Sequence, residues 1–158
     1  MRARLLAVPV IVLVLAVPAG LAAVRSAGTL SVEAGVGRVV VKGQGTLVGR
    51  LDRGDVVIVD LTPNDQWSPR VNGVPRGRVV SLRGRDVNLF IPGGRYRITL
   101  RGDGIALSAR GTGTAELRAR PLLRSLPGTY AIGDDRPRAL PDETAKVTFG
   151  TPDKDDDA

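Results

Sequence analysis

The sequence predicts an all-β fold, an antiparallel sandwich or small barrel of about 8 to 10 short strands behind an apolar N-terminal segment. From Thr29 onward, apolar residues recur at every second position, which is the period of a β-strand. The alternating runs last about 5 to 7 residues and are separated by Gly, Pro, Asn or Asp, which favour turns. Beyond the N-terminal segment, no window keeps a sustained apolar stripe at helical spacing.

Each alternating run identifies residues that are expected to face the core. In chain order they are Leu30 and Val32; Val39 and Val41; Val57, Val59 and Leu61; Val87, Leu89 and Ile91; Tyr96, Ile98 and Leu100; Ile105, Leu107 and Ala109; and Ala115, Leu117 and Ala119. Because only 3% of the residues are aromatic, this core has to be built mainly from Val, Leu, Ile and Ala.

The composition excludes several kinds of chemistry. With 158 residues, the chain is long enough for one domain with a sizeable core. It has no Cys and no His, which excludes thiolate nucleophiles, disulfides, imidazole catalysis and the usual zinc and copper ligands. A hard cation held by carboxylates remains compatible with the composition, but no pattern predicts a metal site or a cofactor.

The formal net charge of +7 favours an anionic partner. A basic chain can bind nucleic acid, anionic lipid or an acidic wall polymer, and an excess of Arg also follows from GC-rich coding alone. The last residues, 151–158, are acidic instead. We expect them to form a disordered tail that screens the basic body.

The N-terminal residues, 1–22, are typical of a signal peptide. Arg2 and Arg4 precede a long apolar run, and Gly20 and Ala22 provide the small residues of a cleavage site. The alternative is an uncleaved anchor, because the uncharged stretch is about as long as a membrane-spanning helix. A signal without a Cys after it excludes lipoprotein anchoring.

Both alternatives predict an extracytoplasmic protein, since the positive N-terminus stays inside while the rest of the chain is exported. The N-terminal segment then enters the membrane at least during export. We expect residues 23–28 to form a short linker and residues 29–150 to form a single all-β domain that is secreted, associated with the envelope or anchored in the membrane.

Gly-x-Gly steps punctuate the predicted strands, and three of them are interpreted as structural. Their glycines are Gly43 and Gly45, Gly102 and Gly104, and Gly111 and Gly113. A dinucleotide-binding loop has to enter a helix, whereas these steps lead into further alternating runs, so we expect tight turns that close the ends of strands. The segments GVGRVVVKGQGTLVGRL and GDGIALSARGTGTAELR share this order, as an internal repeat or by chance recurrence of Gly.

The stretch PGGRYRITL resembles the corner of bacterial immunoglobulin-like sandwiches. That resemblance implies that Tyr96 is a structural clamp whose hydroxyl ties a loop back to the backbone. The body as a whole is similar to uncharacterised exported β-sandwich-like proteins of high-GC bacteria, in the order VKGQGTLVGRL, VDLTPND, PRVNG, IPGGRYRI and GDGIALSARGTG. This second resemblance implies no assigned activity.

The long stretch from Asp60 to Arg78 shows no strand alternation and contains a candidate ligand face. Its members are Trp67, Arg70, Asn64 and Asp65, which offer an aromatic platform, a fork for anions, and polar groups for hydroxyls. The alternative is a long connection between sheets in which the Trp covers the open end of the core.

A basic face is expected on one strand, because Arg95, Arg97 and Arg101 lie opposite its apolar positions. Neighbouring strands extend the face if they add Arg83, Arg85 and Arg110. An anionic cell-wall polymer or lipid head groups fit it better than nucleic acid, for which a row of stacking aromatics is missing. The alternative is an ordinary solvated surface.

Together these features predict an uncharacterised exported, non-catalytic β-domain of the cell envelope that acts by binding or as a structural part. One alternative is a membrane-tethered envelope module of the same fold. Another is a small carboxylate-dependent hydrolase, since carboxylates are the only plausible acid–base groups and Asp52, Asp55, Asp60 and Asp65 lie close in sequence. Asp is also favoured in turns, and Asp52 and Asp55 lie in RLDRGDV, which reads as a hairpin turn.

Overall fold

A computed structural model describes residues 28–62, 68–120 and 126–150 as one antiparallel open sheet, which confirms the all-β prediction. The strands are β1 (Gly28–Asp60), β2 (Arg70–Val71), β3 (Val74–Pro75), β4 (Val79–Ile91), β5 (Arg95–Ala119), β6 (Thr129–Ile132), β7 (Arg138–Ala139) and β8 (Ala145–Phe149). Their order is β3-β2-β4-β1-β5-β8, and β6 pairs with both β1 and β7. The predicted signal segment, most of the linker and the acidic tail lie outside the described residues.

Two long strands wind around each other at the centre of the sheet. Ile98 of β5 pairs with Val41 of β1 on one side and with Ile58 of the same strand on the other, seventeen positions further along. Along residues 95–111 of β5, residues 28–44 of β1 therefore lie on one side and residues 45–60 lie on the other, and residues 37–44 pair a second time with residues 112–119. One turn of this two-stranded coil takes about 17 residues, at roughly 3.3 Å per residue.

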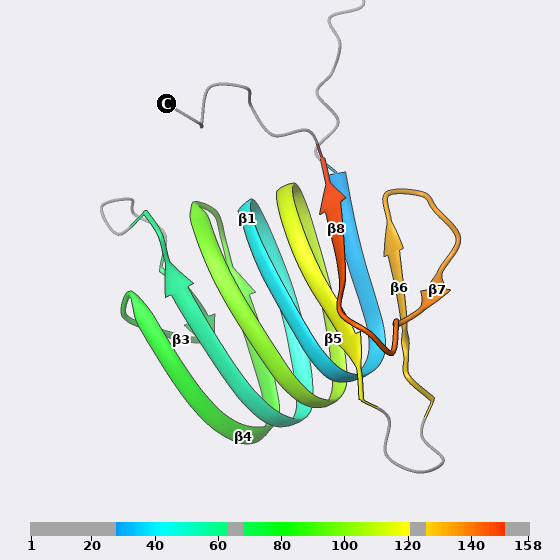
Figure 1. The fold of residues 1–158 in the computed structure, drawn as a ribbon. Helices are drawn as coiled ribbons and strands as arrows, with labels where there is room; N and C mark the ends of the chain where they lie inside the picture. The colour runs from blue at the N-terminus through cyan, green and yellow to red at the C-terminus, as the bar shows by residue number, and fades with distance from the viewer. Residues whose placement is uncertain (1–27, 63–67, 121–125, 151–158) are drawn as a thin grey trace, which may run out of the picture.

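Each long strand bends at the bottom of the molecule and returns upward, so that the sheet forms two facing walls (Figure 1). The front wall contains residues 37–44 and 53–60 of β1, 95–102 and 112–119 of β5, 79–84 of β4, and β8. The rear wall contains residues 28–35 and 45–51 of β1, 105–111 of β5, 86–91 of β4, and β2 and β6.

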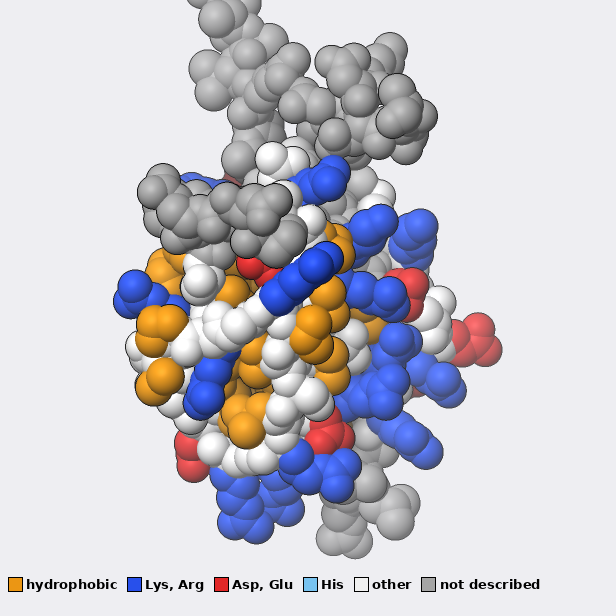
Figure 2. All heavy atoms as spheres, turned by 90° about the vertical axis from the view of Figure 1, so that its left-hand side faces the viewer, with side chains coloured by type: hydrophobic (Ala, Val, Ile, Leu, Met, Phe, Trp, Pro, Cys, Tyr) orange, Lys and Arg blue, Asp and Glu red, His pale blue; other side chains and the backbone are white. Residues whose placement is uncertain are grey.

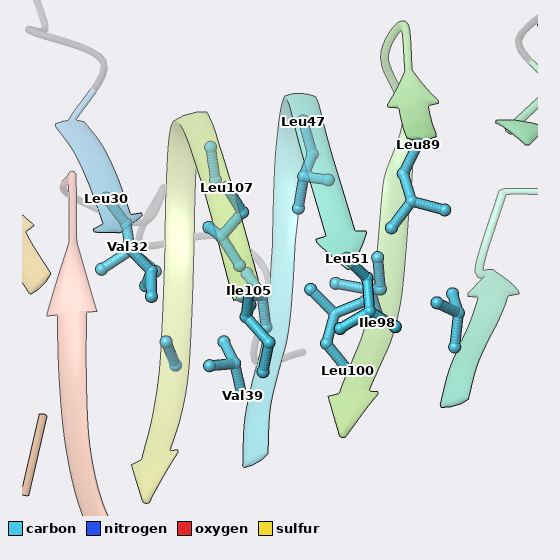
Figure 3. Close-up of a cluster of buried hydrophobic side chains, with 14 of the residues drawn as sticks. Leu30, Val32, Val39, Leu47, Leu51, Leu89, Ile98, Leu100, Ile105 and Leu107 are labelled. Atoms are coloured by element: carbon cyan, nitrogen blue, oxygen red, sulfur yellow. The ribbon is translucent and has the colours of Figure 1, made fainter. Parts of the chain in front are cut away.

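The core lies between the two walls and consists of one cluster (Figure 3). Leu30 and Leu47 enter it from the rear wall, and Ile98 and Leu100 enter it from the front wall, all with no exposed area. Burying each of these large aliphatic side chains stabilises the fold by about 1.5–3 kcal/mol. Six of the seven predicted runs contribute the expected residues to this cluster, and in the seventh the alternate residues are buried instead.

The exception is the run VVIVDL. The structure buries Val56 and Ile58 completely, whereas Val57 is 36% exposed, so the predicted core positions Val57, Val59 and Leu61 are wrong. A continuous apolar run has no period of its own, and pairing decides which face is buried. Here Val56 pairs with Leu100, and Ile58 pairs with Ile98, both of which point inward.

The prediction of many short strands is also wrong, because β1 has 33 residues and β5 has 25. The Gly-x-Gly steps were expected to close strands, but each is a bend within a strand that continues. RLDRGDV is likewise part of β1 and not a hairpin turn.

The expected long loop between Asp60 and Arg78 contains a short hairpin instead. β2 and β3 are joined by Asn72 and Gly73, which both have positive φ, at 50° and 77°. This combination is typical of a type I′ turn, for which Asn-Gly is strongly preferred. The Asn72 side chain also accepts a hydrogen bond of 2.8 Å from the backbone N–H of Asn88 in β4, which holds the hairpin on the sheet.

Within the described ranges, no helix is long and apolar enough to span a membrane.

Candidate anion-binding groove

The predicted structural glycines lie where the strands bend. The upper bend contains Gly43, Gly45, Gly111 and Gly113, and the register pairs Gly43 with Gly113 and Gly45 with Gly111. Gly45 and Gly111 have φ values of 130° and 142°, and a Cβ on either would overlap a carbonyl oxygen of the paired strand. Only glycine allows two backbones to approach this closely in that conformation.

The lower bend contains Gly37, Gly54, Gly84 and Gly102 from four neighbouring strand segments. Gly102 pairs with both Gly37 and Gly54, and Gly54 pairs with Gly84. Gly104, which also belongs to the predicted set, lies just beyond this bend with a φ of 64° and packs against the Asp52 side chain.

Tyr96 is a core residue, and the clamp implied by the immunoglobulin-like resemblance is not found. The side chain is 2% exposed, and its hydroxyl has no hydrogen-bond partner among the described residues. The reason is its place within β5, where it pairs with Gly43 and Asp60 and the ring points inward rather than toward a connecting loop. Burial raises the pKa of this hydroxyl to about 12.

The predicted ligand face lies mostly outside the described residues. Trp67, Asn64 and Asp65 lie outside the described residues, and only Arg70 is described. Arg70 is exposed in β2 and pairs with Phe90 on the rear wall.

The predicted basic face lies on the outer surface of the front wall. Arg95, Arg97 and Arg101 are exposed there, alternating with buried residues of β5. The neighbouring strand segments add Arg38, which lies directly opposite Arg101, and Arg118, which lies one strand further on. Viewed from the β4 end, Lys and Arg side chains gather along the lower rim and on the right, which is the front-wall side (Figure 2).

Of the additional arginines, Arg83 joins this face, Arg85 lies beside the lower bend opposite Arg53, and Arg110 lies on the rear wall. The front wall is therefore the basic one, although Arg110 is not part of it.

An open groove of about 810 Å³ runs along the lower bend and cuts across the strands. Its lining consists of the four glycines of the lower bend, Val36, six arginines (Arg38, Arg53, Arg83, Arg101, Arg118 and Arg120) and two carboxylates (Asp55 and Asp103). Six positive and two negative charges give the lining a formal charge of +4. Because glycine has no side chain, the floor of the groove consists of backbone atoms. The flexible arginine side chains on either side of this floor can therefore reach an occupant of the groove.

One side of the groove is a line of directly paired residues that we call the basic row: Arg118, Arg38, Arg101, Asp55 and Arg83. Like charges placed directly opposite on neighbouring strands are destabilising by about 0.2–1 kcal/mol per pair. Two such pairs occur here, Arg118 with Arg38 and Arg38 with Arg101.

Only part of this charge is compensated within the described residues. Arg83 forms a bidentate ion pair with Asp55, with its Nη2 at 3.1 Å from the second carboxylate oxygen. Arg38 lies 3.6 Å from Glu116, and its Nε is buried without a hydrogen-bond partner in the described part of the chain. Arg101 and Arg118 form no ion pair with another described residue.

The hydrogen bonds from Arg83 are the main cause that lowers the pKa of Asp55, with further contributions from the charges of Arg83 and Arg101. Asp55 is therefore ionised at neutral pH and stays so below the ordinary range of a carboxyl group. The same contact raises the pKa of Arg83.

The remaining carboxylates of the predicted hydrolase set have local roles. Asp52 pairs with Arg50 at 2.8 Å, and Asp60 accepts a hydrogen bond of 2.9 Å from the backbone N–H of Thr62. Asp65 lies outside the described residues. In the described part, no three carboxylates gather in a way that would hold a metal ion.

Sequence reasoning missed Arg38, Arg53, Arg118 and Arg120 as members of the site. A signal exists for one of them, Arg118, because it follows the predicted Arg101 by the length of one turn of the coil, the same spacing that separates Gly37 from Gly54. The repeated segments noted above also lie side by side, since residues 37–50 of β1 pair with residues 106–119 of β5.

No family model, no curated protein and no solved structure matches this chain.

Proposed function

We propose that this chain is an exported, non-catalytic β-domain of the cell envelope that binds an anionic wall polymer in the groove at its lower bend. The observation that carries the proposal is the basic row, in which three arginines lie directly opposite one another without a carboxylate between them. Arginines placed this way repel each other in the free protein. An anionic occupant removes the repulsion and receives charge-assisted hydrogen bonds.

The shape of the site supports a polymer over a lipid surface. The groove is concave and follows the bend between the two walls, so a flexible chain can lie along its floor. A flat layer of lipid head groups would contact only the rims. The N-terminal apolar segment supports a location outside the cytoplasm, where acidic wall polymers are found, whether the segment is cleaved or retained as a tether.

The proposal includes the finer fold prediction. We take the two walls, which share one core, as a sandwich-like arrangement formed by bending one sheet rather than by stacking two. In this arrangement the bend itself provides the binding surface, because its glycines form a floor between the arginines of the front wall and the side chains of Arg53 and Asp103.

The test is a binding experiment with the full-length chain in a mild detergent and a soluble poly(glycerol phosphate). We expect Arg-dependent binding that weakens as salt is raised from about 0.05 to 0.5 M, because exposed charges are screened over a shorter distance. The double variant Arg38→Gln/Arg101→Gln should lose at least tenfold in affinity. The matched control, Arg70→Gln/Arg110→Gln, removes two exposed arginines from the rear wall and should change the affinity less than twofold.

Three results would overturn the proposal: no binding at low salt, equal losses in both double variants, or stronger binding to phosphatidylglycerol vesicles or an oligonucleotide than to the polymer. A parallel fractionation of cells, with the N-terminal mass of the recovered chain, tests export. A mass beginning near Ala23 indicates release, whereas a retained segment from Met1 to Ala22 indicates a tether. Recovery from the cytosol would contradict the location.

A further inference from the structure

We propose that the groove holds one phosphodiester chain in single file, running across the strands along the basic row. The bound segment contains about three phosphates, since neighbouring phosphates of the polymer are separated by six bonds, or roughly 7 Å. This inference rests on the proposed function and specifies the chemistry and length of the segment that is bound.

The direction of the bound chain follows from the register. Arg118, Arg38, Arg101, Asp55 and Arg83 occupy five adjacent strand segments at the same height beside the lower bend. Neighbouring strands lie about 4.8 Å apart, so the row extends about 19 Å perpendicular to the strands. The glycine floor has the same direction, since Gly37, Gly102, Gly54 and Gly84 are consecutive partners. An extended polymer contacts the most arginines when it lies parallel to both.

The chemistry of the bound charge follows from the spacing of the arginines. A carboxylate is planar, and both of its oxygens can be occupied by a single guanidinium fork. A phosphodiester is tetrahedral, so its oxygens point in different directions and can accept hydrogen bonds from two arginines at once. Arg38 and Arg101 are paired directly across two strands and can bracket such a group.

The position along the row follows from Asp55. Its carboxylate stands between Arg101 and Arg83 and already holds Arg83. The strongest contacts are therefore expected at Arg38 and Arg101, with Arg118 contacted by the next units of the chain and Arg83 reached only by a longer chain. A groove of about 810 Å³ is the size that encloses a drug-sized molecule, which corresponds to a short piece of a polymer.

The experiment measures the affinity of the full-length chain for defined glycerol phosphate oligomers of one, two, three, four, six and eight units. We expect the affinity to rise at least tenfold between one and three units. Beyond four units it should increase only in proportion to the number of positions at which the longer chain can bind. Oligomers of glutamate with the same number of charges should bind at least tenfold more weakly.

Two variants place the bound segment. Arg118→Gln removes the end of the row and should weaken the four-unit oligomer at least fivefold while changing the two-unit oligomer less than twofold. Arg101→Gln removes the centre and should weaken both. Arg110→Gln, an exposed arginine of the same strand on the rear wall, should weaken neither.

The outcomes separate this inference from the proposed function. Absence of binding to the long polymer overturns both. Binding that depends on Arg38 and Arg101 but rises steadily with length and never levels off leaves the proposed function intact and overturns the single-file segment. Single glycerol phosphate binding as tightly as three units, or glutamate oligomers binding equally well, also overturns it.

Discussion

The upper and lower bends have the same close backbone packing but differ in the charges of the residues that flank them. In both, glycines of paired strands face each other so closely that a Cβ would overlap a carbonyl oxygen. The upper bend is flanked by pairs in which a cation faces Thr, such as Thr46 with Arg110 and Lys42 with Thr114, and by one pair of like charges, Lys42 with Arg97. The lower bend is flanked by Arg facing Arg. Because the upper bend forms without such a cluster, the arginines of the lower bend are not needed for bending.

The difference separates what folds the chain from what gives it a function. Glycine pairs at both bends are a requirement of the coil, and side chains packed inside it provide the stability. The basic row adds repulsion to the lower bend without adding to the core. This concentration of like charge at one of the two bends is the observation behind the proposed ligand. The predictions below test this division, beginning with the largest effect on stability.

The first prediction concerns Phe149, which is 1% exposed and packs against Gly43 and Gly113 at the upper bend. Phe149→Ala should lower the free energy of unfolding by about 3–5 kcal/mol, because it removes a large buried side chain and leaves a cavity. Urea denaturation measures the loss. If the variant stays folded, its affinity for the polymer should be unchanged, and a parallel loss of affinity would mean that the two bends are coupled.

The second prediction compares one glycine from each bend. Gly45→Ala and Gly54→Ala both place a Cβ against a carbonyl oxygen at positive φ, so each should lose about 3 kcal/mol from strain and crowding. Gly77→Ala is the control, because a Cβ there meets nothing within 4 Å; its stability should stay within about 0.5 kcal/mol. A loss at only one bend, measured by thermal unfolding, would contradict their structural equivalence.

The bends also show how far the sequence could predict the fold. Alternation identified Leu30, Ile98 and Leu117 as core residues because the period of two is a local property. It failed at Val57, where every neighbour is apolar and only the register with Thr99 decides the face. Glycine was correctly linked to tight backbone geometry, but a bend that continues a strand and a turn that ends one contain the same residues.

The candidate groove could not be predicted from the sequence, for a different reason. Arg101 was assigned to a basic face from its own strand, which local alternation allows. Its partner Arg38, and Arg118 one strand further on, come from other strand segments, and their arrangement depends on the winding of β1 around β5. Composition and alternation contain no information on that register. The Asn72–Gly73 turn, by contrast, was present in the sequence as a strong hairpin signal and was missed.

The third prediction concerns Tyr96, whose buried hydroxyl lacks a partner within the described residues. Tyr96→Phe should stabilise the protein by about 1 kcal/mol, because an unsatisfied buried hydroxyl is costly to desolvate. A clamp of the immunoglobulin-like kind would instead make this variant less stable. Chemical denaturation at pH 7 decides between the two.

The same residue predicts an alkaline effect. The pKa of Tyr96 is raised by burial to about 12, from an ordinary value of 10.0. A group with a raised pKa contributes stability that is complete below its unfolded pKa and is lost as the pH rises toward the folded value. The wild type should therefore lose stability relative to Tyr96→Phe between pH 10 and 12, and equal pH dependence of the two proteins would show that the hydroxyl is accessible to water.

The last and smallest effect on stability is expected at Asp55, the single carboxylate of the basic row. Its pKa is lowered, chiefly by hydrogen bonds from Arg83, so its contribution is present at neutral pH and is lost as the pH falls below the ordinary value of 3.8. Asp55→Asn should thus be slightly less stable than the wild type at pH 7 and no less stable in acid.

The effect of Asp55→Asn on binding should have the opposite sign, because the substitution frees Arg83 and removes a negative charge from the path of the polymer. We expect the affinity for poly(glycerol phosphate) to rise about threefold at low salt, the range of an exposed ion pair. Asp52→Asn is the control, because Asp52 pairs with Arg50 and does not line the groove, and it should leave the affinity unchanged. Weaker binding by Asp55→Asn would mean that the ion pair positions Arg83 for the ligand, and the lower bend would then depend on its carboxylate as well as on its arginines.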